Sequence, residues 1–241
     1  MASFSLTDAT TWVHGYDFTT DMNEISLSLS AEELDVTTFG SGGYRTRIAG
    51  LKDVESNLKG FWQSAESAAV DPQAFPDLGT ADRVITQSPT GVAASTAYMY
   101  QAGKFTYELF GSIGEATPFS LGCKGTNGVG VVRGQVAAAK GNVSATGQLG
   151  SILSLGAVGA TQYLYGTLHV FSAGTTITVQ LQSDDDVGFA SPTTRATFSL
   201  ITTTGGNWAV RTAGALAETH YRLNVSAITG TFQVAGAIGI G

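Results

Sequence analysis

The chain has 241 residues, of which 43% are hydrophobic and only 13% are charged, and its net charge of −7 makes it acidic. This balance excludes nucleic-acid binding by phosphate neutralisation, which requires clustered lysine and arginine. The 31 glycines, together with many serines and threonines, favour strands joined by tight turns over long helices.

The chain shows no targeting or membrane-spanning pattern. Its first residues, MASFSLTDATTWV, lack a basic region followed by an apolar stretch, so we expect no secretory signal there. No apolar run reaches the roughly 18 residues of a membrane span, because the nearest one, Leu149 to Val170, is interrupted by polar residues. We therefore expect synthesis in the cytosol and no membrane contact.

Period-two patterns, which are typical of half-buried strands, recur along the chain. Ile25, Leu27 and Leu29 alternate with serines, and the segment 177–182 alternates apolar residues with threonine and glutamine. Clusters of glycine, asparagine, proline and serine separate the further expected strands, which are Tyr44–Ile48, Val54–Trp62, Phe105–Phe110, Phe119–Lys124, Val129–Val136, Tyr163–Phe171, Ala196–Thr202, Trp208–Arg211, His220–Ser226 and Thr231–Ile238.

One short helix is expected near residues 71–79. Asp71 followed by Pro72 resembles an N-cap and a first-turn proline, and Gly79 is placed to end the helix. Pro76 within this segment keeps the helix short.

An internal repeat relates the two halves of the chain. At an offset of 150 residues, four residues of the first half have identical counterparts in the second, namely Asp35, Phe39, Ser41 and Arg45 with Asp185, Phe189, Ser191 and Arg195. At an offset of 102 residues, a second set matches, namely Leu121, Gly128, Val132 and Gly134 with Leu223, Gly230, Val234 and Gly236. The difference of 48 between the offsets predicts an insertion in the first half, which contains the expected helix.

We therefore expect two tandem domains of β-sandwich or partial-barrel type. The first covers residues 1–142 and includes the short helix, and the second, shorter domain covers 143–241. The segment Ala137–Gly150, with the sequence AAAKGNVSATGQLG, has the composition of a linker between them.

No pattern of catalytic or metal-binding residues emerges from the sequence. His14, His169 and His220 lie on separate expected strands without ligand spacing, and Cys123 reads as a small buried residue. The acidic run Asp184–Asp186 could hold calcium, but it lacks the alternating carboxylates of a calcium loop. We expect a solvated loop there, or an acidic ring if an assembly repeats it. We expect no enzymatic activity, no metal and no cofactor.

The segment Leu34–Trp62, LDVTTFGSGGYRTRIAGLKDVESNLKGFW, resembles the tail tube (major tail) proteins of long-tailed phages. The shared pattern is an acidic strand end, a Gly/Ser-rich loop, a basic residue, and then I-x-G-L-K-D leading into a strand. FPDLG at Phe75–Gly79 and GVGVVRGQV at Gly128–Val136 fit the same pattern, so the likeness covers mainly residues 15–138. The two halves of this chain depart from the usual single domain of that family.

The resemblance implies a small β-sandwich whose strands join those of neighbouring copies into a ring around a channel. The rings stack into a tube through which DNA passes during ejection without specific binding. A long loop reaches the next ring, and here it matches Glu32–Tyr44, with its echo at Asp184–Thr194. The resemblance therefore implies inter-subunit contacts from the eight repeat residues, namely Asp35, Phe39, Ser41, Arg45, Asp185, Phe189, Ser191 and Arg195. The candidates for acidic channel residues are Glu32, Glu33, Asp184 and Asp186.

The same resemblance implies a homo-oligomer of three two-domain chains or of six chains per ring. Its other partners would be the tape measure, terminator and distal tail proteins, and its place would be the virion tail, after synthesis in the bacterial cytoplasm. Two alternatives remain open at this point. One is another virion component, such as a head decoration, tail terminator or baseplate ring protein, and the other is a carbohydrate-binding β-sandwich.

Overall fold

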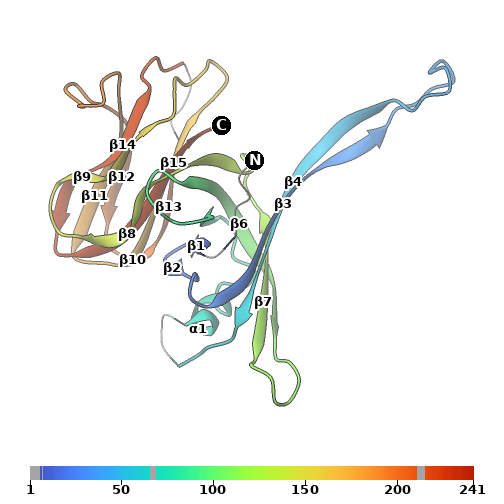
Figure 1. Cartoon of the computed structure of the whole chain (residues 1–241), viewed down its shortest axis with the longest axis horizontal. Coiled ribbons are helices and arrows are strands. Elements are labelled where there is room, and N and C mark those ends of the chain that lie inside the picture. Colours follow the sequence, from blue (N-terminus) through green and yellow to red (C-terminus); the bar gives the residue numbers. More distant parts are fainter. Residues whose placement is uncertain (1–5, 7, 66–68, 211–214) are drawn as a thin grey trace. The chain divides into compact units, whose positions relative to one another are not determined.

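The computed structural model describes residues 6, 8–65, 69–210 and 215–241. These residues form antiparallel strand ladders and one short helix, so the expected all-β class is confirmed (Figure 1). The last residue of the expected strand Trp208–Arg211 lies outside the described residues. The elements are β1 (Thr10–Val13), β2 (Tyr16–Asp17), β3 (Met22–Asp35), β4 (Arg47–Phe61), α1 (Val70–Ala74), β5 (Arg83–Ser88), β6 (Thr96–Leu109), β7 (Pro118–Gly125), β8 (Val132–Val143), β9 (Gly147–Ser154), β10 (Leu164–Ser172), β11 (Thr176–Asp184), β12 (Thr193–Ile201), β13 (Gly205–Val210), β14 (His220–Thr229) and β15 (Phe232–Ile240).

The chain divides into two compact units. Unit 1 gathers residues 1–20, 83–100 and 132–241, and unit 2 consists of residues 21–82 and 101–131. This division differs from the expected boundary between residues 142 and 143, because β8 pairs with β15 and keeps the end of the first half in unit 1. The reading of Ala137–Gly150 as a linker is wrong, since most of this segment lies in β8 and β9, with Ala137 and Ala138 buried.

Unit 1 contains a sandwich of two sheets. The larger sheet has the order β13-β10-β15-β8-β6-β5-β1-β2, and the smaller has the order β12-β11-β14-β9. Inward-facing residues of both sheets form one hydrophobic core, which includes Leu168, Leu181, Phe198, Tyr221 and Phe232. The alternation of residues 176–181 in β11 explains this arrangement, because period two directs one face of a strand to the core.

The larger sheet of unit 1 curls so that the β1–β2 turn meets β10 and β13. His169 Nδ1 lies 2.7 Å from the carbonyl oxygen of His14, and the backbone N–H of Gly206 donates to His14 Nδ1 over 2.9 Å. Because a carbonyl can only accept, Nδ1 of His169 carries the hydrogen. Nε2 of His169 then accepts from the Thr86 hydroxyl, 2.8 Å away. The sequence did not indicate that two of the three histidines would meet.

Acidification is expected to weaken unit 1 through His169. Burial lowers the pKa of this ring to about 4, although the hydrogen bond to the His14 carbonyl opposes the shift. In the unfolded chain His169 takes up a proton near pH 6.5, whereas in the folded chain it does so only near pH 4. The stability that depends on neutral His169 is therefore fully present above pH 6.5 and is lost as the pH falls to about 4. We expect the free energy of unfolding to drop by about 2 kcal/mol between about pH 7.5 and pH 5. Urea titrations at both pH values measure this drop.

The His169→Gln variant provides the control, because glutamine does not titrate in this pH range. Its free energy of unfolding should depend less on pH than that of the wild type. An unchanged pH dependence would assign the proton to another group.

Unit 2 is built on a four-stranded sheet in the order β3-β4-β7-β6, to which β6 contributes residues 101–109. Val54 and Leu58 of β4 and Leu121 of β7 are buried on this sheet, and Val70 and Ala74 of α1 are buried as well. The expected helix is confirmed, but it covers only Val70–Ala74. Its N-cap is Ala69, so Asp71 lies in the first turn and is not the capping residue.

Cys123 lies on β7 and is fully buried, as the sequence predicts. Burial raises the pKa of its thiol to about 12, while the nearby Lys104 ammonium acts in the opposite direction. Because the thiolate is the reactive form, we expect the folded protein to react with a thiol reagent at pH 8 roughly a thousandfold more slowly than unfolded protein does. Absorbance during labelling measures both rates, with urea-unfolded protein as the control. Labelling of the folded protein at the unfolded rate would contradict the burial of this thiol.

The internal repeat is matched by two hairpins, β3–β4 and β11–β12. They are joined differently to the strands that follow, however, because β7 pairs with β4 whereas β14 pairs with β11. The hairpins therefore occupy different positions in their sheets. Duplication of a domain stays a prediction.

Candidate assembly surface

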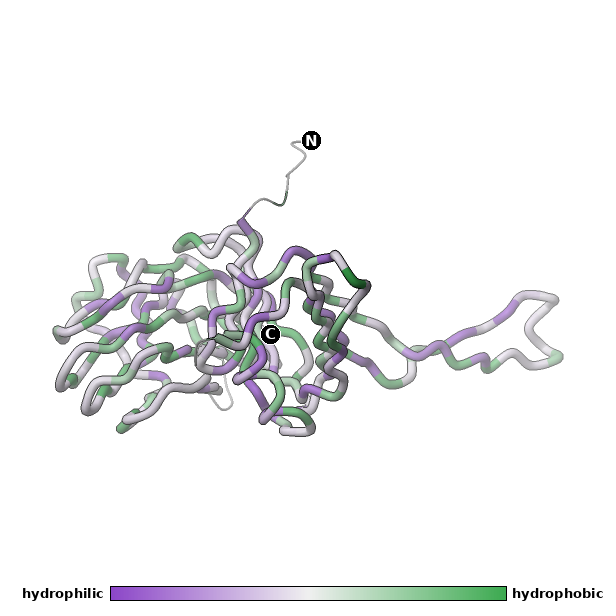
Figure 2. Tube along the Cα trace, turned by 90° about the horizontal axis from the view of Figure 1, so that it is seen from below, coloured by the Kyte–Doolittle hydropathy of each residue, from purple (hydrophilic) through white to green (hydrophobic). Residues whose placement is uncertain are grey.

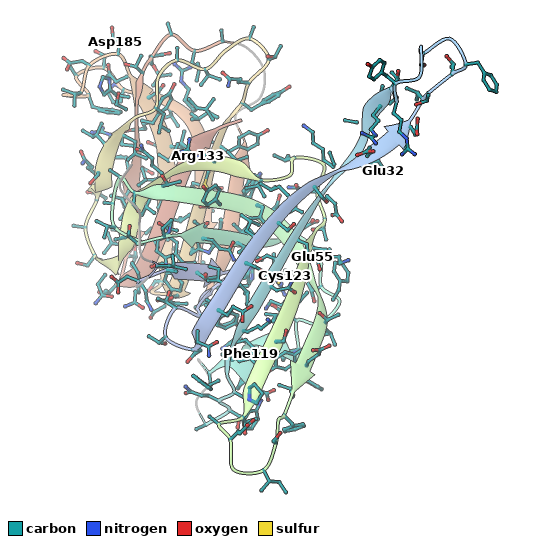
Figure 3. The ribbon with its side chains drawn as sticks, turned by 45° about the vertical axis from the view of Figure 1, so that its right-hand side comes forward. Glu32, Glu55, Phe119, Cys123, Arg133 and Asp185 are labelled. Atoms are coloured by element: carbon teal, nitrogen blue, oxygen red, sulfur yellow. The ribbon has the colours of Figure 1, made fainter. Side chains whose placement is uncertain are left out.

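A two-stranded ribbon projects from the sheet of unit 2. β7 pairs with β4 only from Glu55 to Phe61, and Ser28 of β3 lies opposite Glu55. From Arg47 to Val54, β4 has β3 as its only strand neighbour among the described residues, so this part of β4 and Leu29–Asp35 of β3 form a ladder of two strands. These seven strand residues extend the ribbon by about 23 Å. Figure 1 shows this ribbon leading away from β7, and Figure 3 places Glu32 on it and Glu55 at its base.

The ribbon corrects the expected loop Glu32–Tyr44. Residues 32–35 belong to β3, and β4 begins at Arg47, so the connecting segment is 36–46, which we call the ribbon tip. The expected strands at Tyr44–Ile48 and Val54–Trp62 are therefore parts of one ladder. The glycines of the tip and the acidic residues of β3 concealed this continuity in the sequence.

A register shift between Ala31 and Glu33 arranges the side chains of the ribbon. Leu34 lies opposite Ile48, and a Cβ on Gly50 would lie 3.2 Å from Leu34 Cδ1 and 2.8 Å from a carboxylate oxygen of Glu32. On the neighbouring positions, Glu33 pairs with Arg47 at 2.5 Å between Oε1 and Nε. Exposed apolar and charged residues are thus interspersed along the ribbon, where Figure 2 shows both hydrophobic and hydrophilic colours.

Two of the sequence-selected residues hold the ribbon tip in shape. The Asp35 carboxylate accepts the backbone N–H of Thr37 over 2.9 Å and also the Thr37 hydroxyl, and this side-chain hydrogen bond is the main reason that its pKa is lowered. The Ser41 hydroxyl accepts the backbone N–H of Thr38 over 3.1 Å. Asp35 and Ser41 therefore fix the turn, as side chains of this type do in Asx and Ser turns.

The other two residues of that set face solvent. Phe39 is fully exposed at the ribbon tip, and Arg45 is exposed without an ion pair to any described residue. An exposed phenylalanine costs free energy in water unless another surface covers it. These two side chains are therefore the ones available for contact with another molecule.

The counterpart loop in unit 1, residues 185–192, is closed on itself. The Asp184 carboxylate accepts the backbone N–H groups of Asp186 over 3.1 Å and Ser191 over 3.0 Å. The hydrogen bond from Asp186 is the largest cause of the lowered pKa of Asp184. Phe189 is only 6% exposed, and the Arg222 guanidinium lies 4.3 Å from its ring centre.

Arg195 likewise has partners inside unit 1. Its Nε donates to the Ser183 hydroxyl over 2.7 Å, and its guanidinium pairs with Glu218. The matching residues of the repeat thus differ in setting, because Phe39 and Arg45 are exposed whereas Phe189 and Arg195 are engaged. Inter-subunit contacts through the second loop stay a prediction.

The four acidic channel candidates also differ in setting. Glu32, Glu33 and Asp186 are exposed, whereas Asp184 is buried and satisfied by backbone donors. Asp185 is exposed, and Figure 3 shows it on its loop. A channel role for these residues stays a prediction.

The outer edge of β3 is a feature that sequence reasoning missed. β3 has 14 residues, pairs with β4 alone among the described strands, and contains neither proline nor lysine. Its register shifts against β4 lie at Met22/Glu24 and Ala31/Glu33, so the stretch between them, residues 25–30, is regular and carries no charge. Such an edge presents a row of backbone N–H and C=O groups to a further strand. The alternation at Ile25–Leu29 was a visible signal for the strand, but not for its position at an edge.

Among residues 6, 8–65, 69–210 and 215–241, no group of three or more His, Cys, Asp and Glu side chains is placed to hold a metal ion. Within the same residues, no helix has the length and apolar character needed to cross a membrane.

No protein-family model matches this sequence, and no curated protein matches it. Among solved structures, a chain in the virion of a native gene transfer agent particle is 16% identical, with a TM-score of 0.44 over 54% of this chain and 98% of its own. A chain in the tail of an empty particle of that kind is 19% identical, with a TM-score of 0.37 over 44% of this chain and 78% of its own. The SPP1 Dit protein, described as a hub adsorption apparatus of phages, is 12% identical, with a TM-score of 0.36 over 95% of this chain and 98% of its own. All three come from phage or gene-transfer particles, but likenesses at these TM-scores establish neither the fold nor the function of this chain.

Proposed function

We propose that this chain is a non-enzymatic structural subunit of a phage-type virion, and specifically that copies of it form the rings of a tail tube. The observation that carries the proposal is the sheet of unit 2, with its long unpaired edge at β3 and its projecting ribbon. A long open edge is a liability in a monomer, and pairing with another copy removes it.

The strand order of unit 2 suits closure into a ring. Successive strands in the order β3-β4-β7-β6 are antiparallel, so β6 runs opposite to β3. The outer side of β6 is engaged at Lys104, where the backbone N–H of Gly79 donates to the Lys104 carbonyl over 2.7 Å. Residues 105–109 of β6 are therefore the part that a β3 strand from a second copy would extend, in an antiparallel manner. Because this interface joins two different edges, it repeats head to tail and closes when the rotation allows.

The surface composition supports assembly as well. Only 13% of residues are charged, so little charge has to be desolvated when copies meet. In a closed ring, exposed carboxylates such as Glu32 and the net negative charge would keep DNA from adhering to the channel wall. Three or six chains per ring, and contacts with tape measure, terminator and distal tail proteins, belong to the same proposal.

Electron microscopy of the purified full chain tests the proposal directly. As the protein is concentrated, we expect open-ended tubes with a central channel, accompanied by a mass increase in analytical ultracentrifugation. If the protein forms single closed rings that never stack, its function is that of a terminator or baseplate ring protein and not that of a tube protein. A protein that stays a monomer at high concentration would overturn self-assembly altogether.

A further inference from the structure

Unit 2 carries a second exposed apolar end, far from the ribbon tip. The turn between β6 and β7, residues 110–117, places Phe110 and Ile113 in solvent at 74% and 106% exposure. Pro118 of β7 lies opposite Phe61 of β4, which is also exposed, so the apolar residues continue across the sheet end. We call this surface the β6–β7 end, and define it as Phe61, residues 110–117 and Pro118.

The strand registers place the two apolar surfaces at opposite ends of one sheet. β4 runs from the ribbon tip at Arg47 to Phe61, and Phe61 is the residue beside the first residue of β7. The ribbon tip therefore lies beyond one end of the sheet and the β6–β7 turn beyond the other, as Figure 1 shows. Two different surfaces at opposite ends of a subunit are the requirement for open head-to-tail stacking.

The β6–β7 turn is held in a defined shape. The backbone N–H of Trp62 donates to the Thr117 carbonyl over 2.8 Å, which ties the turn to the end of β4. Within the turn, the N–H of Glu115 donates to the Ser112 carbonyl over 3.3 Å. Phe110 adopts a left-handed backbone with φ of 73°, which is uncommon for a bulky residue. An exposed aromatic residue is thus presented on a fixed backbone.

The charges of the two ends are complementary. Arg45 is the only charged residue of the ribbon tip, and Glu115 is the only charged residue of the turn 110–117. Both side chains are exposed, and neither forms an ion pair with a described residue. Glu108, at the end of β6, adds a second exposed negative charge to this end of the sheet.

We propose that the β6–β7 end is the docking surface for the ribbon tip of a second copy in the neighbouring ring. In this contact Phe39 and Tyr44 of the tip pack on Phe110 and Ile113. Arg45 of the tip pairs with Glu115. This inference rests on the proposed function, and it names the partner surface for the ribbon. Aromatic and arginine side chains at the centre of such a contact carry most of the binding free energy. The charge pair sets the direction of stacking, since tip against tip or turn against turn would bring like charges together.

Charge exchange tests this contact with little risk to folding, because Arg45 and Glu115 are exposed. The single variants Arg45→Glu and Glu115→Lys each place like charges at every docking contact. We expect the protein concentration needed for tube growth to rise roughly tenfold in each variant. Ring formation through the β3 edge should remain. Sedimentation and electron microscopy separate rings from tubes.

Mixing the two variants gives the decisive result. In a stack that alternates Arg45→Glu rings with Glu115→Lys rings, every tip again meets an oppositely charged turn. We expect the mixture, and likewise the double variant, to recover tube growth. If the mixture assembles no better than its components, while wild-type protein forms tubes, the docking surface is wrong and the proposed function stands. If wild-type protein forms no assembly, the proposed function and this inference both fall.

The apolar part of the contact has its own control. The variant Phe110→Ser/Ile113→Ser should form rings that do not stack, whereas Val92→Ser, at an exposed apolar position in unit 1, should stack as wild type does. Circular dichroism and thermal unfolding verify that both variants are folded. Normal tubes from the folded double-serine variant would contradict the proposed packing.

Discussion

A chain whose ribbon is replaced by a tight turn is expected to fold normally and to lose tube assembly. Ala31 lies opposite Lys52, so replacing residues 32–51 by Asn-Gly closes a two-residue hairpin in the existing register. The removed residues are almost all exposed and contribute none of the buried core, so the unfolding temperature should change by no more than about 2 °C. Electron microscopy should show rings without tubes.

A smaller deletion provides a graded comparison. Removal of Gly40–Gly43 shortens the ribbon tip but keeps both strands, and we expect a folded subunit that polymerises poorly. The tube yield should therefore decrease in the order wild type, four-residue deletion, full replacement. Normal tubes from the full replacement, with unchanged ring contacts, would show that the ribbon does not join rings.

Replacement of Lys104 by methionine is expected to cost about 3–5 kcal/mol of unfolding free energy in unit 2. The Lys104 side chain is fully buried on β6, and its ammonium lies 3.0 Å from the Asp77 carboxylate, whose side chain is only 14% exposed. Methionine preserves much of the packing volume but leaves Asp77 without this countercharge. Because total stabilities are about 5–15 kcal/mol, the loss should be evident in urea unfolding.

The double variant Lys104→Met/Asp77→Asn separates charge from packing. With the carboxylate removed as well, no buried charge lacks its partner, so we expect part of the lost stability to return. Asp77→Asn alone should also destabilise, because it removes the Asp77 charge from beside the buried Lys104 ammonium. If the double variant is no more stable than Lys104→Met, then lost packing, and not the unpaired carboxylate, explains the effect.

Much of the strand content could be predicted from the sequence, because period-two alternation reports which residues of a strand face the core. β11 and β14 are examples, with buried Val179 and Leu223 at alternating positions. The burial of Cys123 was predictable from its small size, and the approximate place of the helix from Pro72 and Gly79. Strands such as β1, β5 and β9 were missed because they are short or rich in glycine and polar residues.

The candidate site was only partly predictable. The Gly/Ser-rich tip with Phe39 and Arg45 was visible in the sequence, and these two residues are exposed as a contact surface requires. The equal role assigned to Phe189 depended on sequence identity, which does not report that Asp184 would close the loop and that Arg222 would cover the ring. The β6–β7 end gave no sequence signal, because Phe110 and Ile113 there look like ordinary core residues.

The sequence by itself determined the all-β class, most strands, and a surface poor in charge, because these follow from local periodicity and composition. Only the tertiary structure decided which strands pair, that β3 is an edge, that His14 and His169 meet, and that β8 returns to unit 1. The physical reason is that strand pairing joins residues far apart in the chain. Its register and neighbours depend on how whole faces pack, which no local pattern records.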